Sequence, residues 1–157
     1  LHVVLVEPEI PPNTGNVART CAATGSQLHL IEPLGFTITD AQLKRAGLDY
    51  WDSIQPQVHP SFEAFLSAVK PRRLHLLSTG ATRSYLKARF EPGDALVFGS
   101  ETRGLSDALL ARYPDQVAGI PLQAQHVRSL NLSSAAAIVI YEALRQIDGQ
   151  KSSPPEG

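Results

Sequence analysis

Short apolar runs alternate along the chain with longer segments of helical pattern. The apolar runs are rich in Val, Leu and Ile and have the length of strands, at residues 3–6, 27–31, 74–78, 95–98 and 117–122. Capping residues and helix-ending Gly or Pro help to place predicted helices at residues 17–24, 40–46, 62–69, 107–113 and 131–146. Strands that are apolar throughout and separated by helices are typical of a sheet covered on both faces. The pattern therefore predicts an α/β fold with a mainly parallel sheet flanked by helices.

The length of 157 residues suits one domain. We see no internal repeat and no linker, so we expect a single domain over residues 1–147. Residues 148–157 are rich in Gly, Lys, Ser and Pro. A segment of that composition is expected to form a disordered tail.

Composition argues against several classes of function. The single cysteine, Cys21, lies in an apolar helical stretch, and the five histidines show no ligand spacing. We therefore expect no metal site, and a cytoplasmic location. No apolar run reaches the roughly 18 residues that a membrane span needs. The net charge of −1 argues against binding nucleic acid by bulk electrostatics, so RNA binding would depend on local clusters of arginine.

Three polar segments follow predicted strands or begin predicted helices, at residues 13–19, 98–105 and 128–134. Ligands of parallel sheets bind beyond the carboxyl ends of the strands. The three segments therefore predict a ligand site at that edge of the sheet.

The first segment joins a strand to a helix. Asn13 or Asn16 can cap the helix, and Gly15 allows close backbone approach. Free N–H groups at such a helix start attract phosphate, and Arg19 lies one turn further on. The alternative, which the residues leave open, is a capped loop with a surface arginine.

The second and third segments also allow two interpretations each. Gly99 and Gly104 flank Glu101 and Arg103, which suits either a ligand contact or an exposed Glu–Arg pair in a turn. Ser129 or Asn131 can cap the last helix. That helix is apolar nearly all round, so it is either a central core helix or part of a subunit interface.

Taken together and in this order, the segments resemble the motifs of the SPOUT superfamily of RNA methyltransferases. The resemblance is carried by Asn13-Thr14-Gly15-Asn16 with Arg19, by Phe98 to Leu105, and by Ser129 to Ser133. Residues 7–16 and 45–50 are similar to one subfamily, the tRNA (cytidine/uridine-34) 2′-O-methyltransferases, which act at the wobble nucleotide of certain leucine tRNAs. The resemblance extends from Val3 to Gln146.

The resemblance implies a carboxyl-terminal trefoil knot, a homodimer that binds tRNA across both subunits, and no metal. It implies S-adenosyl-L-methionine as the cofactor, with S-adenosyl-L-homocysteine as product. The implied cofactor-binding residues are Leu77, Ser78, Thr79, Gly99, Glu101, Ile120, Leu122, Ser129 and Leu130. The implied catalytic residues are Arg19, Asn13, Asn16 and Asn131. RNA contacts are expected from Arg19, Arg103, Arg128, Lys44 and Arg45.

Two alternatives share the fold. One is a non-catalytic RNA-binding or assembly factor, against which the intact polar residues of the three segments argue. The other is a ribosomal RNA 2′-O-methyltransferase. Enzymes of that kind usually carry an added RNA-binding domain, which a chain with the length of the catalytic domain alone would lack.

Overall fold

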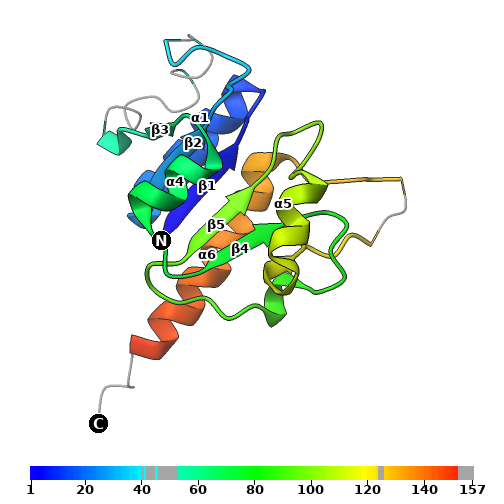
Figure 1. Cartoon of the computed structure of the whole chain (residues 1–157). Coiled ribbons are helices and arrows are strands. Elements are labelled where there is room, and N and C mark those ends of the chain that lie inside the picture. Colours follow the sequence, from blue (N-terminus) through cyan, green and yellow to red (C-terminus); the bar gives the residue numbers. More distant parts are fainter. Residues whose placement is uncertain (40, 42–44, 46–52, 124–125, 152–157) are drawn as a thin grey trace.

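A computed structural model describes residues 1–39, 41, 45, 53–123 and 126–151 of the chain. Strands and helices mostly alternate, as Figure 1 shows, although β3 directly follows β2 among the described elements. The strands are β1 (His2–Val6), β2 (Gln27–Ile31), β3 (Gln57–His59), β4 (Leu74–Leu77), β5 (Ala95–Phe98) and β6 (Val117–Ala118). The α-helices are α1 (Pro11–Thr24), α4 (Phe62–Val69), α5 (Asp107–Arg112) and α6 (Leu132–Lys151). Two short 3-10 helices are η1 (Tyr85–Lys87) and η2 (Pro114–Gln116).

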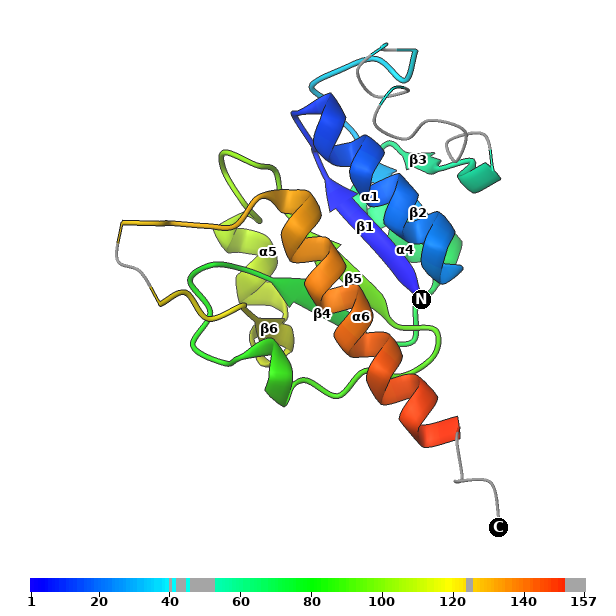
Figure 2. The ribbon, with the colours of Figure 1, turned by 180° about the vertical axis from the view of Figure 1, so that it is seen from behind.

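The six strands form one sheet in the order β3-β2-β1-β5-β4-β6, and all of the described pairs are parallel. This confirms the predicted α/β class with a mainly parallel sheet. Helices α4 and α5 cover one face, and α1 and α6 cover the other, as Figures 1 and 2 show from opposite sides. Both faces of the central strands are therefore buried, which explains why these strands are apolar throughout.

The core divides by strand alternation. Val3 and Leu5 of β1 pack on the side of α1 and α6, whereas Val4 packs on the side of α4 and α5. Helices α1 and α6 also pack against one another. Cys21 lies fully buried in α1, and burial raises the pKa of its thiol to about 12, which suits a side chain that packs in the core.

Helix α1 begins at Pro11, six residues before the predicted start at residue 17, so the predicted capping by Asn13 or Asn16 is wrong. Ile10 occupies the N-cap position and makes no side-chain cap. Proline suits the first turn because its fixed φ is helical and the N–H that it lacks would have no helical partner. The two prolines therefore open the helix and do not precede it.

Other boundaries also differ from prediction. The strand expected over residues 117–122 ends at Ala118, and the short strand β3 was missed because it has only three residues, of which two are exposed. Helix α6 runs to Lys151, so residues 148–151 are helical and not part of a disordered tail. Buried Ile147 keeps the helix on the core through that turn. The helix predicted at residues 40–46 lies largely outside the described residues.

Strand β6 and the residue after it lie between β4 and residues 83–85. On one side the Ser78 N–H donates to the Ala118 carbonyl at 2.9 Å. On the other, the Gly119 N–H donates to the Arg83 carbonyl at 2.9 Å, and the Tyr85 N–H donates to the Gly119 carbonyl at 2.8 Å. A Cβ on Gly119 would lie 2.5 Å from the Ser78 carbonyl oxygen, so only glycine fits in this passage.

Among the described residues, no helix combines the length and apolar character that crossing a membrane requires.

Candidate functional site

A cavity of about 560 Å³ lies at the carboxyl ends of β4 and β5, where the sequence predicted a ligand site. It is bounded by the loops that follow β4, β5 and β6 and by the start of α6. All nine residues predicted to bind a cofactor line it: Leu77, Ser78, Thr79, Gly99, Glu101, Ile120, Leu122, Ser129 and Leu130. Asn13, Asn131, Arg103 and Arg128 line the same cavity.

Other predicted site residues lie elsewhere. Asn16 and Arg19 are exposed on α1 and do not line the cavity. Arg19 lies six positions after Asn13 in the helix, which corresponds to roughly 9 Å along the axis. Arg45 is exposed and does not line the cavity, and Lys44 lies outside the described residues. The cavity therefore unites the second and third segments with only the first turn of α1.

A chain of hydrogen bonds connects the three segments beside the cavity. The Asn131 side chain caps α6 by accepting from the Ser133 N–H at 2.9 Å and the Ser133 hydroxyl at 2.6 Å. Its amide nitrogen donates to Asn13 Oδ1 at 3.0 Å. Asn13 in turn donates to Glu101 Oε2 at 3.3 Å. One polar side chain from each segment is thus fixed relative to the other two.

The start of α1 does not offer the free N–H groups that we predicted for a phosphate. Pro11 and Pro12 have no N–H, and the Asn13 N–H donates to the Ile10 carbonyl at 3.1 Å. The two preceding N–H groups, of Glu9 and Ile10, donate to Glu101 at 2.9 and 2.7 Å. Glu101 therefore takes the place of an external anion, and a phosphate would have to be bound by side chains.

Two glycines of the second segment serve a close backbone crossing. A Cβ on Gly99 would lie 2.1 Å from the Gly104 carbonyl carbon and 2.3 Å from the Leu105 nitrogen. Gly104 has a φ of 67°, in the left-handed region that favours glycine. The loop from Gly99 to Leu105 consequently folds back on the end of β5 and forms one wall of the cavity.

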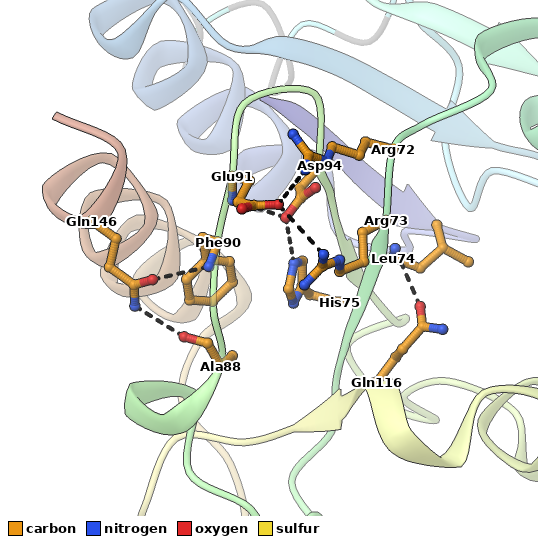
Figure 3. Close-up of polar contacts among 10 residues, drawn as sticks. All are labelled: Arg72, Arg73, Leu74, His75, Ala88, Phe90, Glu91, Asp94, Gln116 and Gln146. Carbon is orange, nitrogen blue, oxygen red and sulfur yellow. Dashed lines mark hydrogen bonds and ion pairs between the residues drawn. The ribbon is translucent and has the colours of Figure 1, made fainter. Parts of the chain in front are cut away.

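A second polar cluster, which the sequence did not reveal, lies at the amino ends of β4 and β5, away from the cavity (Figure 3). His75 Nε2 lies 2.7 Å from the buried Asp94 carboxylate, which also accepts from the Glu91 N–H at 2.9 Å. Glu91 pairs with Arg72 at 2.8 Å and with Arg73 at 3.4 Å. Burial lowers the pKa of His75, and the Asp94 carboxylate opposes that shift only in part. Gln146 of α6 holds the segment before Glu91 against the helix layer. Its side chain accepts a hydrogen bond from the Phe90 N–H and donates one to the Ala88 carbonyl.

Three of the histidines that seemed scattered form a row across β1, β2 and β3. His29 Nε2 lies 3.0 Å from His2 Nδ1, and His29 Nδ1 lies 3.0 Å from His59 Nε2. Burial and the two neighbouring histidines lower the pKa of His29 to about 3. The row is not a metal site, because no group of three or more candidate ligands with metal-binding geometry occurs among the described residues. Only the strand pairing brings these side chains together.

A parallel sheet with a ligand-sized cavity at the carboxyl ends of its strands defines an α/β domain of the kind that binds small molecules. The family model of the SpoU rRNA methylases matches residues 1–141, and the chain belongs to this family. This confirms the predicted resemblance to RNA methyltransferases.

Relatives of known name cover almost the whole chain. A tRNA (cytidine(34)-2'-O)-methyltransferase of Burkholderia pseudomallei (strain 1106a) is 52% identical over 148 residues, which are 92% of this chain and 94% of the relative. The enzyme of the same name from Escherichia coli (strain K12) is 48% identical over 148 residues, or 94% of each chain.

Two solved structures are similar as well. One, described as giving structural insights into the 2-OH methylation of C/U34 on tRNA, superposes with a TM-score of 0.88 at 51% identity, over 94% of this chain and 96% of the other. The SpoU methyltransferase AviRb of Streptomyces viridochromogenes, in complex with the cofactor AdoMet, gives a TM-score of 0.83 at 25% identity, over 93% of this chain and 57% of AviRb.

Proposed function

We propose that this protein methylates the ribose 2′-hydroxyl of the cytidine or uridine at position 34 of tRNA, with S-adenosyl-L-methionine as methyl donor. The observation that carries the proposal is that one cavity gathers Asn13, the Gly99–Leu105 loop and the Arg128–Asn131 segment. Relatives about 50% identical over nearly the full chain carry the name of that activity. The leucine tRNAs, a cytoplasmic location and the individual residue roles belong to the same proposal.

The residues around the cavity suit the cofactor. A volume of about 560 Å³ lies within the range of small-molecule sites, roughly 300–1,000 Å³. Apolar side chains of Leu77, Ile120 and Leu130 can pack on the adenine, while Ser78, Thr79 and Ser129 offer hydroxyls to polar groups. Because the chain crosses itself closely at Gly99, backbone atoms form part of the cavity wall there. Bound there, S-adenosyl-L-methionine would supply an electrophilic methyl group on its sulfonium.

The protein's own groups would then bind and orient the RNA. The guanidinium carries five N–H donors in a fixed fork and no acceptor, which suits a phosphate rather than the removal of a proton. We therefore assign Arg19 to the phosphate beside the target ribose, with Asn16 one helical turn away on the same helix. Asn13 and Asn131, joined to Glu101, would hold the start of α1 against the cavity.

RNA affinity would come from local charge, as the net charge of −1 requires. Arg103 and Arg128 are exposed at the cavity and stand on two of its bounding loops. Together with Arg19 they could contact successive phosphates around the target nucleotide. Lys44 and Arg45 would extend the contact.

Two further parts of the proposal concern the chain's topology and assembly. The passage of residues 117–119 between β4 and residues 83–85 supports a trefoil knot here, because a later segment is hydrogen-bonded on both sides to parts of the chain that precede it. Ile138 and Tyr141 are exposed on one face of α6, 37% and 55%, and support a homodimer. A second copy on that face would lie close to α1, which packs beside α6.

Nucleoside mass spectrometry of tRNA from cells with and without the gene tests the reaction. We expect 2′-O-methylcytidine or 2′-O-methyluridine at position 34 of leucine tRNAs to disappear with the gene and to return with purified protein and cofactor. An unchanged methylation profile would overturn the proposal. Isothermal titration with S-adenosyl-L-methionine separates it from the non-catalytic alternative, which predicts no binding.

A further inference from the structure

Two glutamates join the loop before α1 to the loop after β5, an arrangement that we call the glutamate clasp. Glu101 accepts hydrogen bonds from the N–H groups of Glu9 and Ile10. In return, Glu9 Oε1 accepts from the Thr102 N–H at 3.0 Å and from the Thr102 hydroxyl at 2.6 Å. Each loop thus gives a carboxylate to the backbone of the other. Glu101 belongs to the second polar segment, whereas Glu9 has so far had no role.

The backbone of Glu9 is fixed from its other side. A Cβ on Gly35 would lie 2.8 Å from Glu9 Cα, and the Gly35 N–H donates to the Pro8 carbonyl at 2.9 Å. The loop before α1 is therefore held between the segment around Gly35 and the clasp. This makes the Glu9 carboxylate a fixed acceptor, and the Thr102 loop the part that it positions.

The positioned loop is the cavity wall. It turns back through a bond from the Gly104 N–H to the Ser100 carbonyl at 2.8 Å and one from the Arg103 N–H to the Ser100 hydroxyl at 3.3 Å. Its exposed tip, Thr102 and Arg103, lines the cavity. Hydrogen bonds from the Thr102 side chain and backbone, with smaller effects of Ser100 and the Arg103 charge, lower the pKa of Glu9. The carboxylate is therefore charged at neutral pH and can restrain the tip.

We propose that Glu9 is a positioning residue for methyl transfer, which holds Thr102 and Arg103 at the cavity wall so that the cofactor site keeps its shape and Arg103 faces the RNA. This inference rests on the proposed function. The Glu9 contact to Thr102 is charge-assisted, so its loss is expected to weaken cofactor and RNA binding by about tenfold.

The test compares Glu9→Ala, Glu9→Gln and the control Glu32→Ala, which removes an exposed glutamate that does not line the cavity. We would measure the Kd of S-adenosyl-L-methionine by titration calorimetry, KM and kcat with tRNA, and the unfolding midpoint. Glu9→Ala is expected to raise Kd and KM about tenfold and to change kcat at saturation much less. The amide oxygen of Glu9→Gln can still accept from Thr102 but without the charge, so this variant should recover part of the affinity and give Kd and KM values between those of Glu9→Ala and the wild type. Glu32→Ala should match the wild type.

A purely structural role for Glu9 would lower the unfolding midpoint and leave Kd and KM within twofold of wild type, and that result would overturn the inference. Should Glu9→Ala not fold, Glu9→Gln and Thr102→Val carry the test. Because Glu9 acts through Thr102, Glu9→Gln should have less effect on Kd in the Thr102→Val background, and additive effects would also refute the inference. If the wild type binds cofactor but methylates no tRNA, the proposed function fails, while the cofactor Kd still decides the role of Glu9.

Discussion

Polar side chains serve different purposes at the two ends of the strands. We call the side of the sheet where the strands begin its amino edge, and the side where they finish its carboxyl edge. At the amino edge His75, Asp94 and Glu91 bond to one another and to nearby backbone, in a cluster packed between the strands and α6 (Figure 3). At the carboxyl edge Asn13, Glu101 and Asn131 form a similar chain of hydrogen bonds, but this chain borders a cavity. Hydrogen-bonded polar side chains alone therefore do not distinguish a structural cluster from a ligand site. The space beside them does.

If the cluster at the amino edge is structural, a substitution there should cause the largest loss of stability. Asp94→Ala removes the acceptor of both His75 and the Glu91 N–H in a fully buried place. Leaving buried donors without a partner should lower the free energy of unfolding by about 3 kcal/mol. Denaturant unfolding measures this, with exposed Asp115→Ala as control. Methyl transfer per folded molecule should be unchanged, and a loss of turnover beyond the unfolded fraction would contradict the division between the edges.

At the carboxyl edge the expected effect is on turnover. Arg19→Lys keeps the charge and removes the bidentate fork, so kcat/KM with tRNA should fall by about 10- to 100-fold, or roughly 1.4–2.7 kcal/mol of transition-state stabilisation. Arg19 does not line the cavity, so the Kd of S-adenosyl-L-methionine should stay at its wild-type value. Arg112→Lys, on the far side of the sheet at α5, is the matched control. If Arg19→Lys methylated tRNA at nearly the wild-type rate, the proposed bidentate contact between Arg19 and the RNA phosphate would be wrong.

The histidine row links stability to pH. The pKa of His29 falls to about 3 through burial and through its neighbours His2 and His59, whereas an unfolded histidine titrates near 6.5. Only the unfolded chain then takes up this proton between those values. Stability should be level above pH 7 and decline as pH falls below about 6.5, by about 1.4 kcal/mol per pH unit for each histidine that stays neutral.

Thermal unfolding between pH 7.5 and 5.5 measures this slope. His29→Gln should flatten it, while His126→Gln, at an exposed position, should leave it as it is. A slope that His29→Gln does not change would mean that other groups cause the pH dependence.

These features differ in how far the sequence could predict them. Apolar runs predicted the parallel sheet because both faces of its strands are buried. The family resemblance that the three segments carry implied nine cofactor-binding residues, and all nine line the cavity. The predicted helix starts at residues 62 and 107 were also correct, because the caps that set them, Ser61 and Ser106, depend on local sequence. The row of histidines and the bond between Glu9 and Thr102 could not be predicted. They join residues 27, 30 and 93 positions apart, and only the strand pairing brings these together.

The predicted start of α1 was wrong for a different reason. Pro11 and Pro12 favour either a loop or a first helical turn, and local pattern does not decide between them. The distant Glu101 carboxylate, which takes up the N–H groups of Glu9 and Ile10, stabilises the helical choice. The same contact removes the predicted phosphate site, so one long-range carboxylate accounts for both errors.

The smallest effect that we predict is at Lys70, at the amino edge before β4. Lys70 ends α4 in the left-handed conformation with a φ of 51°, which glycine adopts without strain. Lys70→Gly should therefore raise the free energy of unfolding by about 0.5–1 kcal/mol relative to Lys70→Ala, which lacks the charge but keeps the strain. Both variants should methylate tRNA as the wild type does if the amino edge is purely structural. Both variants lack the Lys70 charge, and they differ only in backbone strain. An equal loss of tRNA affinity in both would therefore show that this charge contacts RNA.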